Sequence, residues 1–159
     1  MLFRSGSSIG VRDLTAGVLG ELGAELVFHG ISVRPGKPTI YARAGQKPVF
    51  GMPGVPVSAL VIFDMFVRPL LWRLGGETGR EPWPARLRAR MTRRQASAAG
   101  REDYLRVRLA RRDDGWWAEP LLGGSAAIST VFRADGVVVV PANVEGVGEG
   151  EEVEVLLYE

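Results

Sequence analysis

The 159-residue chain is long enough for one domain or two small ones, and its 46% hydrophobic content suits a protein with a real core. It contains no cysteine, which excludes a disulfide framework and a thiolate metal site. The net charge is +2, with arginines crowded between residues 86 and 112 and glutamates from 145 to 159, which fits an anionic partner or simply a solvated barrel surface.

Two segments are candidates for targeting or membrane insertion, and neither has the required properties. Residues 1–4 are too few for the apolar region of a signal peptide. The apolar run from Val57 to Leu74 is interrupted by polar residues and a proline, and it falls short of the ~20 apolar residues that span a bilayer. We therefore expect a cytoplasmic protein that does not insert into a membrane.

The chain opens with small residues and then takes up a helical pattern. Leu14, Val18 and Leu22 recur at four-residue spacing, which predicts a helix that begins at Asp13. The carboxylate of Asp13 suits an N-cap, and Gly23 suits the left-handed residue that ends a helix.

Short strands follow the helix. Leu26–Phe28 is predicted to be a buried strand, and Thr39–Arg43 alternates as a strand does. Between them, Ser32–Pro38 combines two prolines and a glycine with the cations Arg34 and Lys37. Such a run predicts a rigid cradle for an oxyanion, although a solvated basic turn has the same composition.

The chain is organised around the run Gly51–Ser58, which closes the predicted strand Pro48–Phe50. Its glycines allow backbone angles that other residues avoid, and Pro56 suits the first position of a helix. The first turn of that helix would direct free N–H groups into the loop, those of Val57, Ser58 and Ala59. These donors predict an anion site, and a tight turn without a ligand is the alternative.

The helix that starts at Val57 is apolar on nearly every face, which predicts burial all round, in a core or against another subunit. Asp64 and Arg68 have the spacing of an ion pair, whereas Pro69 removes an internal hydrogen bond and predicts a kink. The pair Gly75–Gly76 ends the helix.

The pattern changes to period two after residues 77–84, which we interpret as a linker between a domain at 1–76 and another at 85–159. Leu87, Ala89 and Met91 alternate with arginines, and the segment Leu105–Leu109 does the same. Asp113–Gly115 has the composition of a hairpin turn. The second domain is therefore predicted to be a small β-barrel.

Four segments together resemble the molybdopterin molybdenumtransferases, the MoeA and gephyrin E-domain family. They are the run Gly51–Ser58, the basic run Arg34–Pro38, the loop Ser5–Asp13, and Gly124–Ser125 followed by Arg133–Gly136. The resemblance implies α/β followed by all-β: the C-terminal half of a three-layer α/β/α molybdopterin-binding domain, then the β-barrel. It also implies a homodimer for the full-length family.

The resemblance implies that molybdate is inserted into adenylylated molybdopterin with the help of Mg²⁺. Asp13 and Lys37 are the implied catalytic residues, and Asp13 is the implied metal ligand. The implied substrate contacts are Ser8, Gly10, Arg34, Gly36, Lys37, Pro53, Gly54, Pro56, Ser58 and Ser125.

The chain departs from the family's pattern at several points. Arg34 replaces the usual lysine, Val55 replaces an asparagine, and Phe3–Ser5 replaces the end of a strand and the start of the first motif. The family's N-terminal domains have no counterpart here. We therefore expect weak ligand binding, no turnover and self-association, because Leu26–Phe28 and Pro48–Phe50 would lack neighbouring strands.

Two other functions remain open, a non-catalytic module that binds anions or nucleic acid and a truncated scaffold remnant. The arginines of the second domain could follow a nucleic-acid backbone. However, they alternate with apolar residues as on any exposed strand face, and stacking aromatic residues are sparse. We therefore expect a small-molecule substrate and no nucleic-acid partner.

Overall fold

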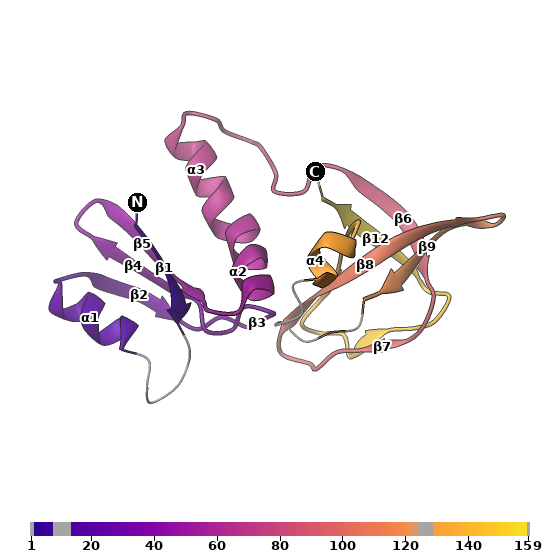
Figure 1. The fold of residues 1–159 in the computed structure, drawn as a ribbon, viewed down its shortest axis with the longest axis horizontal. Helices are drawn as coiled ribbons and strands as arrows, with labels where there is room; N and C mark the ends of the chain where they lie inside the picture. The colour runs from indigo at the N-terminus through magenta and orange to yellow at the C-terminus, as the bar shows by residue number, and fades with distance from the viewer. Residues whose placement is uncertain (1, 8–13, 122, 124–128, 159) are drawn as a thin grey trace. The chain divides into compact units, whose positions relative to one another are not determined.

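The computed structural model describes residues 2–7, 14–121, 123 and 129–158 (Figure 1). They fall into two compact units, Met1–Glu77 and Thr78–Glu159. The first unit mixes helices with strands, and the second consists mainly of strands that close a five-stranded barrel. The predicted fold class, α/β followed by all-β, is confirmed.

The first unit is built on a four-stranded sheet in the order β1-β5-β4-β2. Its strands are β1 (Leu2–Ser7), β2 (Glu25–His29), β4 (Ile40–Ala44) and β5 (Lys47–Pro53), with the short β3 (Val33–Arg34) before β4. Strand β1 runs parallel to β5, whereas the pairs β4–β5 and β2–β4 are antiparallel.

The expectation that two strands lack neighbours is wrong. Pro48–Phe50 lies within β5, which pairs with β1 on one side and with β4 on the other. Leu26–Phe28 lies within β2, which pairs with β4. The segment Phe3–Ser5, expected to replace the end of a strand and the start of the first motif, lies within β1. The pairing of Leu2 with Val49 joins distant parts of the chain, which a local pattern cannot indicate.

Helix α1 (Thr15–Glu21) confirms the predicted helix, and Gly23 has the positive φ of 73° expected at its end. The N-cap position is occupied by Leu14, and Asp13 lies outside the described residues. The apolar positions are largely exposed, since Leu14 is 73% and Leu22 75% accessible.

Strand β2 is exposed, so the prediction of a buried strand is wrong. Leu26 is 47% and Val27 49% accessible. The physical reason is position in the sheet: β2 is an edge strand and pairs only with β4 within the four-stranded sheet. A short apolar run has the same composition at the centre of a sheet and at its edge.

The helical segment after β5 comprises α2 (Pro56–Ile62), the π-helical turn η1 (Phe63–Val67) and α3 (Arg68–Leu74), and Gly75 caps its end as predicted. Its buried face packs on the sheet around Phe50, Met52, Ile62 and Val67. The opposite face is open, because Leu60, Leu71 and Leu74 are exposed, so the helix is not buried all round within this chain and its burial against another subunit stays a prediction.

The helix accommodates Pro69 through the π-helical turn. The N–H of Arg68 donates to the carbonyl of Phe63, five residues earlier, and Pro69 with its missing N–H follows directly. Among the residues that the structure describes, no helix has the length and apolar character of a membrane span.

The second unit closes a barrel of five strands through the neighbours β10-β12-β6-β9-β8 and an additional pairing of β8 with β10. The strands are β6 (Arg86–Met91), β8 (Glu102–Arg112), β9 (Gly115–Pro120), β10 (Gly136–Val140) and β12 (Glu152–Leu157). A separate small sheet joins β7 (Gln95–Ala96) to β11 (Gly146–Val147), and α4 (Ser129–Arg133) precedes β10.

The predicted alternation holds along β6, where Ala89 and Met91 enter the barrel core and the arginines face outward. The predicted hairpin is confirmed, since Asp113 and Asp114 join β8 to β9. One expected exposed residue is buried, because Arg106 on β8 is only 7% accessible. Its Nε donates to the Oγ1 of Thr130 in α4 at 2.8 Å, and this helical turn accounts for the difference.

Candidate functional site

The first candidate element is the basic turn, residues 34–37, between β3 and β4. Arg34 and Lys37 are exposed, and the peptide bond between Arg34 and Pro35 is cis. Gly36 is buried at a φ of 137°, a conformation that favours glycine. The predicted combination of a fixed backbone and outward cations is therefore present.

Hydrogen bonds hold the basic turn on both sides of Lys37. The carbonyl of Gly36 accepts from the Oγ1 of Thr39 at 2.7 Å and from its backbone N–H at 3.2 Å. The carbonyl of Lys37 accepts from the N–H of Ile31 at 2.9 Å. The backbone that carries the cation is thus tied to neighbouring chain segments.

The second candidate element is the turn between β5 and α2. Strand β5 continues through the buried Pro53, so only Gly54 and Val55 separate strand from helix. Pro56 occupies the first helical position as predicted. The N–H of Ala59 donates to the carbonyl of Val55 at 3.0 Å, so the prediction of a free donor there is wrong.

The remaining predicted donors fit the geometry of a helix start. The N–H groups of Val57 and Ser58 have no acceptor within the helix, because their partners would precede its first residue. The Ser58 side chain is buried, whereas Gly54 and Pro56 are exposed. Three predicted substrate contacts, Gly54, Pro56 and the backbone of Ser58, thus lie on one short turn.

The N-cap of α2 offers a test of this local geometry. Val55 has the extended conformation of a cap residue, yet its side chain makes no capping hydrogen bond. We expect Val55→Asn to raise the free energy of unfolding by about 1 kcal/mol, because an amide oxygen can accept a first-turn N–H. Chemical denaturation measures the effect. Val55→Ala is the control, and an equal response of both variants would contradict the capping argument.

The two turns meet through helix α2. A Cβ built on Gly36 would lie 2.5 Å from the Cδ1 and 2.9 Å from the Cγ1 of Ile62, so the basic turn packs directly against this helix. Ile62 is fully buried. The structure therefore packs the basic turn, through Gly36, against the same helix that starts at the second turn.

The continuation of this helix through η1 and α3 carries the predicted i, i+4 ion pair. Arg68 Nη2 lies 2.6 Å from Asp64 Oδ1, and the guanidinium lies 6.0 Å from the ring centroids of both Phe63 and Trp72. Burial raises the pKa of Asp64, and the charge of Arg68 offsets this only in part. These contacts of the pair thus lie within the helical segment itself.

Four predicted site residues, Ser8, Gly10, Asp13 and Ser125, lie outside the described residues. Within the part of the chain that the structure describes, no group of three or more histidine, aspartate or glutamate side chains could hold a metal ion.

Sequence reasoning missed two residues that shape the candidate site. Thr39 was assigned only to a strand, and Ile62 only to an apolar helix. The signal available for Thr39 was its position, since it is a polar residue directly after the second proline of the basic run. No local pattern indicates that Ile62 meets Gly36, because that contact depends on how the helix packs.

Comparisons with known protein families match nearly the whole chain. The family described as "Probable molybdopterin binding domain" matches residues 2–73, and the MoeA C-terminal region (domain IV) matches residues 88–158. The two matches fall within the first and second units respectively.

Individual proteins show the same similarity. Molybdopterin molybdenumtransferase 1 of Mycobacterium tuberculosis is 37% identical over 146 residues, which are 87% of this chain and 34% of that protein. Two crystal structures of the molybdopterin biosynthesis protein MoeA from Pyrococcus horikoshii also match. One has a TM-score of 0.79 at 42% identity, and the match covers 99% of this chain and 37% of the chain in that crystal structure. The other has a TM-score of 0.67 at 29% identity, and the match covers 84% of this chain and 32% of the crystallised chain.

The chain spans about a third of the length of the curated relatives it matches. Both family matches and the order of the two regions agree with the resemblance of the motifs. The chain therefore belongs to the molybdopterin molybdenumtransferase (MoeA) family, of which it carries the molybdopterin binding domain region and the C-terminal region.

Proposed function

We propose that the chain acts in molybdenum cofactor biosynthesis as the molybdopterin-binding part of a molybdenumtransferase. In this reaction molybdate is inserted into adenylylated molybdopterin and the adenylate is released. The observation that carries the proposal is the basic turn, which presents Arg34 and Lys37 to solvent from a backbone held by Thr39 and Ile31.

The basic turn suits a phosphate or another oxyanion. Cations form the stronger, charge-assisted hydrogen bonds with such groups. Arg34 supplies a planar guanidinium that can bind two oxygens, whereas Lys37 supplies a compact point charge. Placed on one turn, the two side chains can bind the phosphate of the pterin from adjacent directions.

The turn between β5 and α2 adds backbone donors for the same substrate. Pro53 and Pro56 limit the conformations of this turn, and the N–H of Ser58 belongs to the first turn of α2. The proposal includes Asp13 as the ligand of Mg²⁺ and Ser8, Gly10 and Ser125 as substrate contacts. It also includes a cytoplasmic location and a homodimer of the full-length protein.

We expect Lys37→Ala to weaken binding of adenylylated molybdopterin without changing the thermal midpoint, because the exposed side chain packs in no core. Calorimetric titration and thermal denaturation measure the two quantities. Lys47→Ala, which removes an exposed lysine from the start of β5, is the matched control. Equal affinity of the Lys37 variant and the wild type would remove Lys37 from the site.

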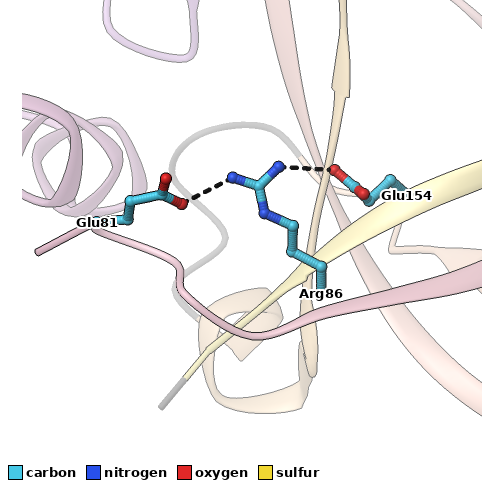
Figure 2. Close-up of polar contacts among 3 residues, drawn as sticks. All are labelled: Glu81, Arg86 and Glu154. Carbon is cyan, nitrogen blue, oxygen red and sulfur yellow. Dashed lines mark hydrogen bonds and ion pairs between the residues drawn. The ribbon is translucent and has the colours of Figure 1, made fainter.

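The arginines of β6 favour this function over nucleic-acid binding. Arg86 contacts two carboxylates, Glu154 at 3.0 Å and Glu81 at 2.8 Å, as Figure 2 shows. Arg88 pairs with Glu152 at 3.4 Å, and Arg90 pairs with Asp114 at 3.0 Å. Carboxylates thus balance the arginines of β6, whereas a nucleic-acid backbone requires uncompensated positive charge.

A further inference from the structure

Thr39 lies directly behind the basic turn and is completely buried. Its Oγ1 donates to the carbonyl of Gly36 at 2.7 Å, and its own carbonyl accepts from the N–H of Gly30 at 2.8 Å. A buried hydroxyl without a hydrogen-bond partner lowers the stability of the fold. The Thr39 hydroxyl keeps its partner only while the basic turn holds its present conformation.

The carbonyl of Gly36 receives two hydrogen bonds from one residue. Both the Oγ1 and the backbone N–H of Thr39 reach it, which orients the peptide group that joins Gly36 to Lys37. On the other side, Ile62 approaches Gly36 so closely that a Cβ there would overlap its side chain. The peptide is therefore held by Thr39, directly before β4, and supported by Ile62 of α2.

This arrangement bears directly on Lys37. The peptide before it is held by Thr39, and the carbonyl after it accepts from Ile31. The lysine side chain is exposed, so its starting point is constrained while its ammonium group is accessible to a ligand. Constraining a binding group before the ligand arrives reduces the entropy lost on binding.

We propose that Thr39 is a positioning residue for the anion-binding turn, acting through the Gly36 carbonyl on Lys37. This inference rests on the proposed function, since it assumes that Lys37 binds the phosphate of the pterin. The positioning role differs from a purely structural role of Thr39 in one measurable respect. Loss of the Thr39 hydroxyl should weaken binding of the pterin only when Lys37 is present.

Three substitutions at this position separate the hydroxyl from the shape of the side chain. Thr39→Val keeps the branched shape and removes the donor, whereas Thr39→Ser keeps the donor. Thr39→Ala also removes the donor and serves if valine prevents folding. Each is made in the wild type and with Lys37→Ala, and affinity for adenylylated molybdopterin is measured by calorimetry below the thermal midpoints.

We expect Thr39→Val to weaken binding about fivefold in the wild type, the factor that corresponds to one lost hydrogen bond. Thr39→Ser should bind as the wild type does. With Lys37→Ala already present, Thr39→Val should cause no further loss. The positioning role would be overturned if Thr39→Val weakened binding equally in both backgrounds. It would also be overturned if Thr39→Val left the affinity unchanged while Lys37→Ala weakened binding. Either result would leave the proposed function intact. No effect of Lys37→Ala itself would overturn both.

Discussion

Gly136→Ala is expected to lower the free energy of unfolding of the barrel by about 3 kcal/mol, at the upper end of the range for overpacking. A Cβ at this position would lie 2.3 Å from the backbone oxygen of Leu156 and 2.9 Å from the Cγ1 of Val155. Gly136 pairs with Val107 on one side and Leu157 on the other, so strand β10 cannot move away from β12.

Urea denaturation followed by tryptophan fluorescence measures this loss, because Trp116 and Trp117 lie in the same barrel. Gly148→Ala is the control. A Cβ there would meet only the side chain of Glu151, which can move. A loss at Gly136 no larger than that at Gly148 would contradict the packing of β10 against β12.

Arg106→Ala is expected to lower the stability of the barrel by about 3 kcal/mol, because it combines a buried void with lost hydrogen bonds. Arg106 Nε donates to the Oγ1 of Thr130 at 2.8 Å, and its Nη2 contacts the carbonyl of Gly123 at 3.4 Å. Burial lowers the pKa of Arg106, and interaction with Tyr158 opposes this. The burial therefore disfavours the charge, and its hydrogen-bond acceptors compensate in part.

Arg108 provides the matched control on the same strand. It is exposed, and Arg108→Ala should change the free energy of unfolding by no more than about 0.5 kcal/mol. Arg106→Lys should recover only part of the stability, since an ammonium group cannot reproduce the planar donors of the guanidinium. If the alanine variants of Arg106 and Arg108 lose the same stability, the account of Arg106 as a structural arginine fails.

Local features of the fold could be predicted because neighbouring residues determine them. The hairpin at Asp113–Gly115, the helix end at Gly23 and the start of α2 at Pro56 each depend on the conformational limits of one or two residues. The alternating arginines of β6 depend on the two-residue period of a strand.

Features that depend on distant segments were not predictable from pattern. The parallel pairing of β1 with β5 joins segments that lie far apart in the sequence, and the end of β1, Ser5–Ser7, falls in the segment that resembles a loop motif. Arg106 occupies an outward position of β8, and it is buried there among segments distant in the sequence, including Thr130 of α4 and Gly123. Period and composition do not contain this information.

The candidate site divides in the same way. The cations Arg34 and Lys37 and the helix start at Pro56 follow from residue types within short segments. The hydrogen bond that Thr39 donates to Gly36 and the support from Ile62 follow from the packed strand and helix. The anion-binding groups could therefore be predicted from the sequence, whereas the residues that hold those groups in position could not.

The most direct test is a titration of the isotopically labelled chain with adenylylated molybdopterin, followed by amide chemical shifts. The account predicts saturable shifts at Gly36 and Lys37 and at Gly54 and Ser58, the two turns of the first unit. Shifts confined to Thr78–Glu159, or no shifts at high ligand concentration, would contradict the placement of the molybdopterin site on these turns.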